Sequence, residues 1–171
     1  MEIVTAKLHI RPSLDDLRGL GETDGLAALM AEVPADLATP VSVFLRLRTG
    51  RPAFLLESVE QGTRTGRYSF IGVEPTAQIT IRGHSASVLS NGKTSLESVD
   101  PQDPFAIVKR WLADAKPIAQ EGTPPFMGGA VGYVVYDMVR MFEPKLGPGP
   151  EPTPFDPPDT CLMLCNTLIA F

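Results

Sequence analysis

Several residue types on which common sites depend are scarce in this chain of 171 residues. It has two cysteines, two histidines and one tryptophan. The cysteines, Cys161 and Cys165, would lie roughly 13 Å apart along an extended segment, which is too far for a disulfide. Without further thiol or imidazole partners nearby they are also a poor zinc site, so we expect two free, buried thiols.

The chain also lacks a long apolar run and an excess of positive charge. No segment approaches the roughly 18 apolar residues of a membrane helix, and the first eleven residues have no apolar core of signal-peptide length. We therefore expect a cytoplasmic protein that does not bind membranes. The formal net charge is -5, from 15 basic and 20 acidic side chains, which argues against nucleic acid as a partner.

A catalytic constellation is absent as well. Neither His9 nor His84 belongs to a Cys-His, Ser-His-Asp or Glu-x-x-His arrangement. No carboxylate cluster suggests a metal ion. From the residues alone we assign no catalytic, cofactor-binding or metal-ligating residue to this chain.

What the chain does have is a succession of short strand-like segments. Asn91-Gly92, between two of them, is a strong hairpin signal. Strands at such short spacing imply an antiparallel sheet. Segment 53–59 is mostly apolar, so we expect it to be buried on both faces. The expected strands are 53–59, 68–73, 78–82, 85–89, 94–96, 126–135 and 161–171.

Three helices are expected beside these strands. Ser13 caps the first, Thr39-Pro40 begins the second, and Asp103-Pro104 opens the third. Segment 26–33 fits a helix or a strand. The predicted fold is α+β in one domain over 1–171, a largely antiparallel, sandwich-like β-sheet with a few flanking helices. Part of the 17 prolines forms a loop over 144–158.

The glycines before Tyr133 invite two interpretations. Gly128, Gly129 and Gly132 suggest a phosphate cradle, but no helix with a Lys-Ser or Lys-Thr signature follows them. Close packing of a strand against neighbouring backbone is the favoured interpretation. Tyr133 approaches a ligand or packs in the core, and we favour the core.

Ordered motifs then resemble one family. Leu55-Leu56-Glu57-Ser58 precedes the segment Gly66 to Gly72, in which we expect Gly72 to permit a tight turn. Thr39 to Ser42 comes before them. The run Phe126 to Tyr133, with Tyr136-Asp137, comes after them. Together they resemble the N-terminal, regulatory domain of anthranilate synthase component I over 36–171, whereas 1–35 match weakly.

The resemblance implies a site for tryptophan, the feedback inhibitor of that family. Its Leu-Leu-Glu-Ser strand supplies Leu56, Glu57 and Ser58, with Ser58 expected to contact the ligand directly. Consecutive residues of a strand point to opposite faces, so Glu57 and Ser58 cannot both face the ligand unless the strand bends. Arg64 stands where many members have lysine. The competing interpretations are an ion pair of Glu57 with Arg67 or Arg46, a strand-end hydroxyl at Ser58 and a solvated charge at Arg64.

The resemblance also implies what the whole enzyme does. Members convert chorismate to anthranilate and pyruvate in tryptophan biosynthesis, with ammonia from a glutamine amidotransferase subunit. The chorismate and Mg²⁺ sites belong to a C-terminal catalytic domain, which we expect to follow Phe171. We therefore expect this chain alone to be inactive and its own catalytic domain to be a partner.

Two alternatives remain open. One is the equivalent part of aminodeoxychorismate (para-aminobenzoate) synthase component I, and the other is a stand-alone amino-acid-binding module. The chain ends in an apolar, strand-like segment, and an unpaired strand edge invites self-association. We therefore also expect self-association into a homo-oligomer.

Overall fold

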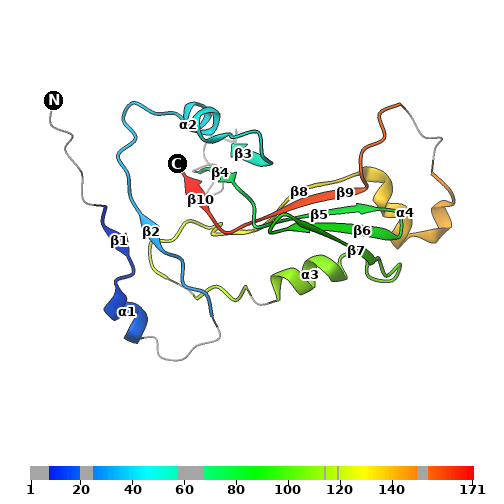
Figure 1. Ribbon diagram of the computed structural model, residues 1–171, viewed down its shortest axis with the longest axis horizontal. Helices are drawn as coiled ribbons and strands as arrows, with labels where there is room; N and C mark the ends of the chain where they lie inside the picture. Colours follow the sequence, from blue (N-terminus) through cyan, green and yellow to red (C-terminus); the bar gives the residue numbers. More distant parts are fainter. Residues whose placement is uncertain (1–7, 20–24, 58–67, 114, 119, 150–153) are drawn as a thin grey trace.

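The protein is described by a computed structural model, which covers residues 8–19, 25–57, 68–113, 115–118, 120–149 and 154–171. Antiparallel strands and short helices make up the described chain (Figure 1), so the predicted α+β class is confirmed. None of the helices in these ranges has the length and apolar character that a membrane crossing requires.

The larger sheet has five strands in the order β7-β6-β5-β9-β8. All its neighbouring strands are antiparallel. Segments far apart in the sequence therefore lie side by side in its centre. The strands are β5 (Ala77–Arg82), β6 (Ser85–Ser90), β7 (Lys93–Ser98), β8 (Gly129–Val134) and β9 (Thr160–Cys165).

A second sheet has the order β10-β4-β3, and a third is the pair β1-β2. The end strand β10 is short but paired, because it lies antiparallel to β4, and Phe171 exchanges two backbone hydrogen bonds with Ser69. The ambiguous segment 26–33 contains a strand rather than a helix. The strands are β1 (Ile10–Arg11), β2 (Met30–Ala31), β3 (Ala53–Glu57), β4 (Ser69–Val73) and β10 (Leu168–Ala170).

Local sequence signals explain where one hairpin turns and where one helix begins. Asn91 and Gly92 both have positive φ, 51° and 72°, the conformation that the predicted two-residue hairpin turn requires. Thr39 caps helix α2 (Pro40–Leu47), and its hydroxyl accepts a hydrogen bond from the Ser42 amide at 3.1 Å. The other helices are α1 (Leu14–Gly19), α3 (Ala106–Leu112) and α4 (Val139–Phe142), with short 3-10 turns at Tyr136–Met138 and Pro144–Leu146.

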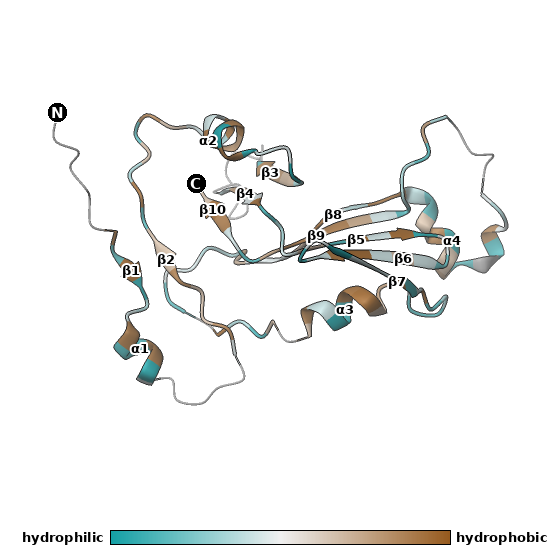
Figure 2. Ribbon diagram, in the orientation of Figure 1, coloured by the Kyte–Doolittle hydropathy of each residue, from teal (hydrophilic) through white to brown (hydrophobic). Residues whose placement is uncertain are grey.

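The main core lies between one face of the five-stranded sheet and α3, which runs along the sheet in Figure 1. Ile79 and Ile81 of β5 are fully buried, whereas Thr80 between them is only partly buried. This alternation is the period of two expected for a strand with one covered face. The hydropathy colouring of Figure 2 shows apolar residues on both α3 and the central strands. The core members are Ala77, Ile79, Ile81, Ala86, Val88, Val99, Ile107, Val108 and Leu164.

Two expectations about β3 and β4 were wrong. The described part of segment 53–59 is not buried on both faces. On one face Phe54 is buried but Leu56 is 46% exposed, and on the other Ala53 and Leu55 are only partly buried. Gly72 does not form a turn. It lies within β4 opposite Phe54, and a Cβ atom there would stand 2.1 Å from the Phe54 ring. The aromatic ring therefore occupies the space that the missing side chain leaves.

Gly132 of β8 does serve close strand packing. A Cβ atom on Gly132 would lie 1.9 Å from the Cys161 carbonyl oxygen in the neighbouring β9. Backbone cannot move aside as a flexible side chain does, so only glycine fits. The favoured interpretation of this glycine is confirmed.

Both thiols are free, with Cys161 half-buried and Cys165 buried, and burial raises the pKa of the Cys165 thiol.

Gly132→Ala is expected to destabilise the chain by about 1–3 kcal/mol, because the new methyl group overpacks the β8–β9 contact. The measurement is the free energy of unfolding from urea titration. Gly19→Ala is the matched control, since nothing lies within 4 Å of its added Cβ. Equal stability of Gly132→Ala and the parent chain would contradict the close contact.

Thr160→Val is expected to raise the free energy of unfolding by about 1 kcal/mol. The Thr160 hydroxyl oxygen is buried in the core and has no hydrogen-bond partner among the described residues, and an unpartnered buried polar atom costs stability. Thermal unfolding would measure the effect. Thr94→Val, at an exposed position of β7, provides the control with the same change of side chain.

Candidate ligand-binding site

The candidate site lies where β3 ends. The β3–β4 register places Leu56 opposite Phe70 and Glu57 opposite Ser69. Because side chains alternate along a strand, Leu56 and Glu57 point to opposite faces of this sheet. Of the four predicted ligand residues these two are described, whereas Ser58 and Arg64 lie outside the described residues.

An aromatic cluster adjoins Leu56. The Phe70 ring stacks on Tyr68 with ring centroids 5.7 Å apart and meets Phe126 edge-on at 5.5 Å. Directly opposed side chains of antiparallel strands have Cβ atoms about 4.5–5.5 Å apart, so Leu56 lies beside this cluster. Together the four side chains form an apolar wall at the end of β3. Sequence reasoning assigned Phe70 to the scaffold. It did not predict the contact between Phe70 and Phe126, because this contact joins segments more than fifty positions apart.

Glu57 directly follows Leu56 of this wall in the chain. Its side chain is exposed and forms no ion pair with any described residue, Arg46 included. The other suggested partner, Arg67, lies outside the described residues. The carboxylate is therefore accessible at the strand end. An accessible carboxylate is chemically suited to an organic ammonium, although the strand alternation turns this one to the sheet face opposite Leu56.

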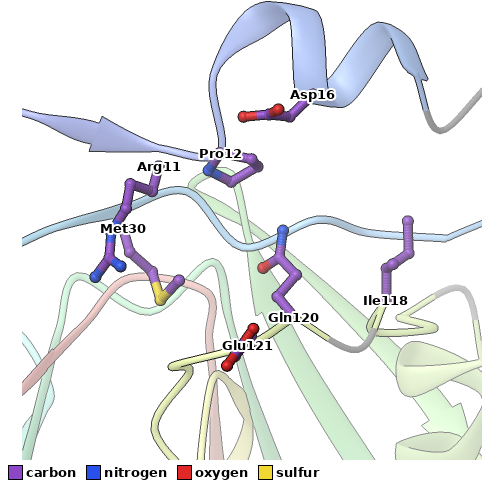
Figure 3. A pocket seen from close by; sticks show the side chains of 7 residues that line it. All are labelled: Arg11, Pro12, Asp16, Met30, Ile118, Gln120 and Glu121. Carbon is purple, nitrogen blue, oxygen red and sulfur yellow. The ribbon is translucent and has the colours of Figure 1, made fainter.

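A separate cavity of about 510 Å³ lies between the N-terminal elements and the residues Ile118, Gln120 and Glu121 (Figure 3). The Gln120 side-chain oxygen in its lining is buried and has no hydrogen-bond partner among the described residues. Asp16, also in the lining, accepts hydrogen bonds from the Ser13 hydroxyl and amide, which hold the pKa of its carboxyl below the usual value. Of the predicted ligand residues, the two that are described, Leu56 and Glu57, do not line this cavity. The lining residues are Arg11, Pro12, Asp16, Met30, Ile118, Gln120 and Glu121.

The remaining candidates do not converge on a reaction centre. His9 and His84 are exposed. In the described ranges no three or more His, Cys, Asp or Glu side chains gather in a way that could hold a metal ion. Tyr133 is 44% exposed on the sheet face opposite α3, so the favoured interpretation of this residue as core was wrong. Its ring follows the strand alternation, which places it opposite Cys161.

The fold and the site define an α+β domain with an apolar wall and an exposed carboxylate at one strand end. No protein-family model matches the chain. Curated relatives do match. Anthranilate synthase component 1 of Pseudomonas putida is 39% identical over 84% of this chain, and that of Synechocystis is 36% identical over 95%. These alignments cover only 29% and 32% of the relatives' own length.

One solved structure, anthranilate synthase component I from Streptococcus pneumoniae TIGR4, is 24% identical over 83% of the chain, with a TM-score of 0.45. The sequence relatives decide the classification. The chain belongs to the anthranilate synthase component 1 family, and it spans less than a third of the length of the relatives it matches.

Proposed function

We propose that this chain is the N-terminal, regulatory part of an anthranilate synthase component 1 and contributes to a feedback site for tryptophan. In the complete enzyme, chorismate and glutamine-derived ammonia are converted to anthranilate and pyruvate. The observation that carries the proposal is the family relationship across most of the chain together with the Leu55 to Ser58 motif. The relatives named above are anthranilate synthases, which favours this branch over aminodeoxychorismate synthase.

The geometry at the end of β3 supports tryptophan as the ligand. Tryptophan presents an indole, an ammonium and a carboxylate. The wall of Leu56 and the aromatic cluster suits the indole, because aromatic rings favour stacked or edge-on packing with one another. The Glu57 carboxylate suits the ammonium. Because Glu57 and Leu56 point to opposite faces of a regular strand, this contact requires the chain to bend where β3 ends.

Two further residues complete this proposal. We assign the direct polar contact to the Ser58 hydroxyl, which follows Glu57 in the chain. Arg64 is the proposed partner of the tryptophan carboxylate, since a guanidinium can bind a carboxylate through two parallel hydrogen bonds. The rest of the pocket is supplied by the catalytic part of the complete enzyme.

The chemistry itself we assign to that catalytic part, which is also where we place chorismate and Mg²⁺. The described residues of this chain offer no metal-holding cluster, so no residue here is given that role. The glutamine amidotransferase subunit is the proposed source of ammonia. This division leaves ligand sensing as the role of the present chain.

The 171-residue chain alone is expected to produce no anthranilate from chorismate, ammonium and Mg²⁺, because it supplies no catalytic constellation. Anthranilate fluorescence provides the assay. A complete anthranilate synthase component 1 assayed in parallel is the positive control. Chorismate-dependent turnover by the 171-residue chain would contradict the division of roles.

In the complete enzyme, Ser58→Ala is expected to raise the tryptophan concentration needed for half-inhibition about 3- to 10-fold while turnover stays largely intact. The reason is the loss of one neutral hydrogen bond to the ligand, which contributes about 0.5–1.5 kcal/mol. Inhibition curves at fixed chorismate would measure it.

Two companion variants sharpen that test. Glu57→Gln keeps the shape of the side chain and removes its charge, so it should weaken inhibition as well. Ser95→Ala changes an exposed serine of β7 and should leave inhibition unchanged. Unaltered inhibition in both Ser58→Ala and Glu57→Gln would rule out the assigned site.

A further inference from the structure

The two edges of the five-stranded sheet differ in chemistry. The β7 edge carries charged and hydroxyl side chains, with Lys93 and Glu97 among them, whereas β8 has no charged residue and no proline from Gly129 to Val134. Figure 2 shows β7 largely in the hydrophilic colour. Charged residues and prolines are the usual protection of an edge strand against pairing with another chain. The β8 edge lacks both.

The ladder between β8 and β9 identifies which backbone groups of β8 are free. The Val135 amide donates to the Asp159 carbonyl at 2.8 Å, in the same register as the strand pairs. Hydrogen-bonded and non-bonded pairs alternate in an antiparallel ladder. Tyr133 and Val131 therefore bond to β9, and the amides and carbonyls of Ala130, Gly132 and Val134 point away from the sheet.

These outward groups have no partner among the described residues. The side chains beside them are also accessible, since Tyr133 is 44% and Val134 46% exposed. Two other edge strands are apolar. β10 has only three residues, and short edges pair weakly. β3 follows Pro52 and ends in the charged Glu57, and prolines and charges protect an edge strand against pairing. Within the described chain, β8 is thus the edge best suited to accept a strand.

We propose that the β8 edge pairs with β8 of a second copy of this chain, in an antiparallel, two-fold arrangement centred on Gly132. The sequence of the edge is suited to this symmetry. Gly132 would face its own counterpart, and Ala130 would face Val134 of the second copy. Each copy then donates three backbone hydrogen bonds, one from each outward residue, so six join the two sheets.

The side chains fit the same register. On the sheet face opposite α3, Val131 of one copy faces Tyr133 of the other, twice by symmetry. A β-branched residue opposite an aromatic one is a favourable cross-strand pair. No like charges meet, because the strand carries none. This inference is independent of the proposed function, since it depends on the edge of the sheet alone.

The test is the mass of the 171-residue chain in solution, measured by sedimentation equilibrium over a concentration series. The expected result is a mass that rises from 18.4 kDa towards twice that value. Association should be weak, because a single strand edge is small beside the roughly 1,200–2,000 Å² of a stable interface. A monomer at every accessible concentration would overturn the proposal.

Two double variants test the register. Val131→Lys with Tyr133→Lys places two lysines opposite each other in both symmetry-related pairs of positions 131 and 133. This like-charge repulsion should raise the dimer dissociation constant at least roughly ten-fold. Val131→Lys with Tyr133→Glu places opposite charges there and should restore much of the association. Equal weakening by both pairs of substitutions would overturn the register. Leu96→Lys, on the β7 edge, is the control and should leave association unchanged.

Amide hydrogen exchange of the unmodified chain tests the same contact without substitutions. Exchange at Ala130, Gly132 and Val134 should slow as concentration rises. The amides of Thr94, Leu96 and Ser98 are the matched set, because the β6–β7 register turns them outward at the other edge. Absence of concentration-dependent protection at the three β8 amides, or equal protection at both edges, would count against the proposal.

Discussion

The pairing of β9 with both β5 and β8 is the interaction on which the rest of the structure depends. It joins segments that are about eighty (β5 and β9) and about thirty (β8 and β9) positions apart in the chain. The inward side chains of these strands meet α3 to form the core. The same run of chain continues into β10, which pairs with β4. One C-terminal segment therefore ties both larger sheets together, and the burial of Ile79 and Leu164 depends on it.

This arrangement also positions the candidate site. β4 is held between β3 and β10, so the end of β3 has a fixed neighbour in Phe70. Phe126, at the approach to β8, closes the aromatic cluster from the other sheet. The apolar wall is thus a product of how the two sheets are connected. A ligand bound there would contact residues whose positions depend on the long-range strand pairs.

Apolar residues are distributed unevenly between covered and accessible surfaces of the chain. One face of the five-stranded sheet is covered by α3, whereas Tyr133 on the opposite face and Val134 at the β8 edge remain accessible. Leu56 is accessible at the candidate site. Such positions stabilise a protein only when something covers them.

The sequence by itself determined the α+β class, the Asn91-Gly92 hairpin, the capped helix after Thr39 and the free thiols. These features depend on residues close together, where turn conformation, capping and strand period act directly. Tertiary structure decided the burial of β3, the role of Gly72 beneath Phe54, the exposure of Tyr133 and the aromatic wall beside Leu56. Each of these features depends on which distant strand or helix lies alongside. The alternation of apolar and polar residues along one strand cannot predict that neighbour, because the same pattern is compatible with a covered or an open face.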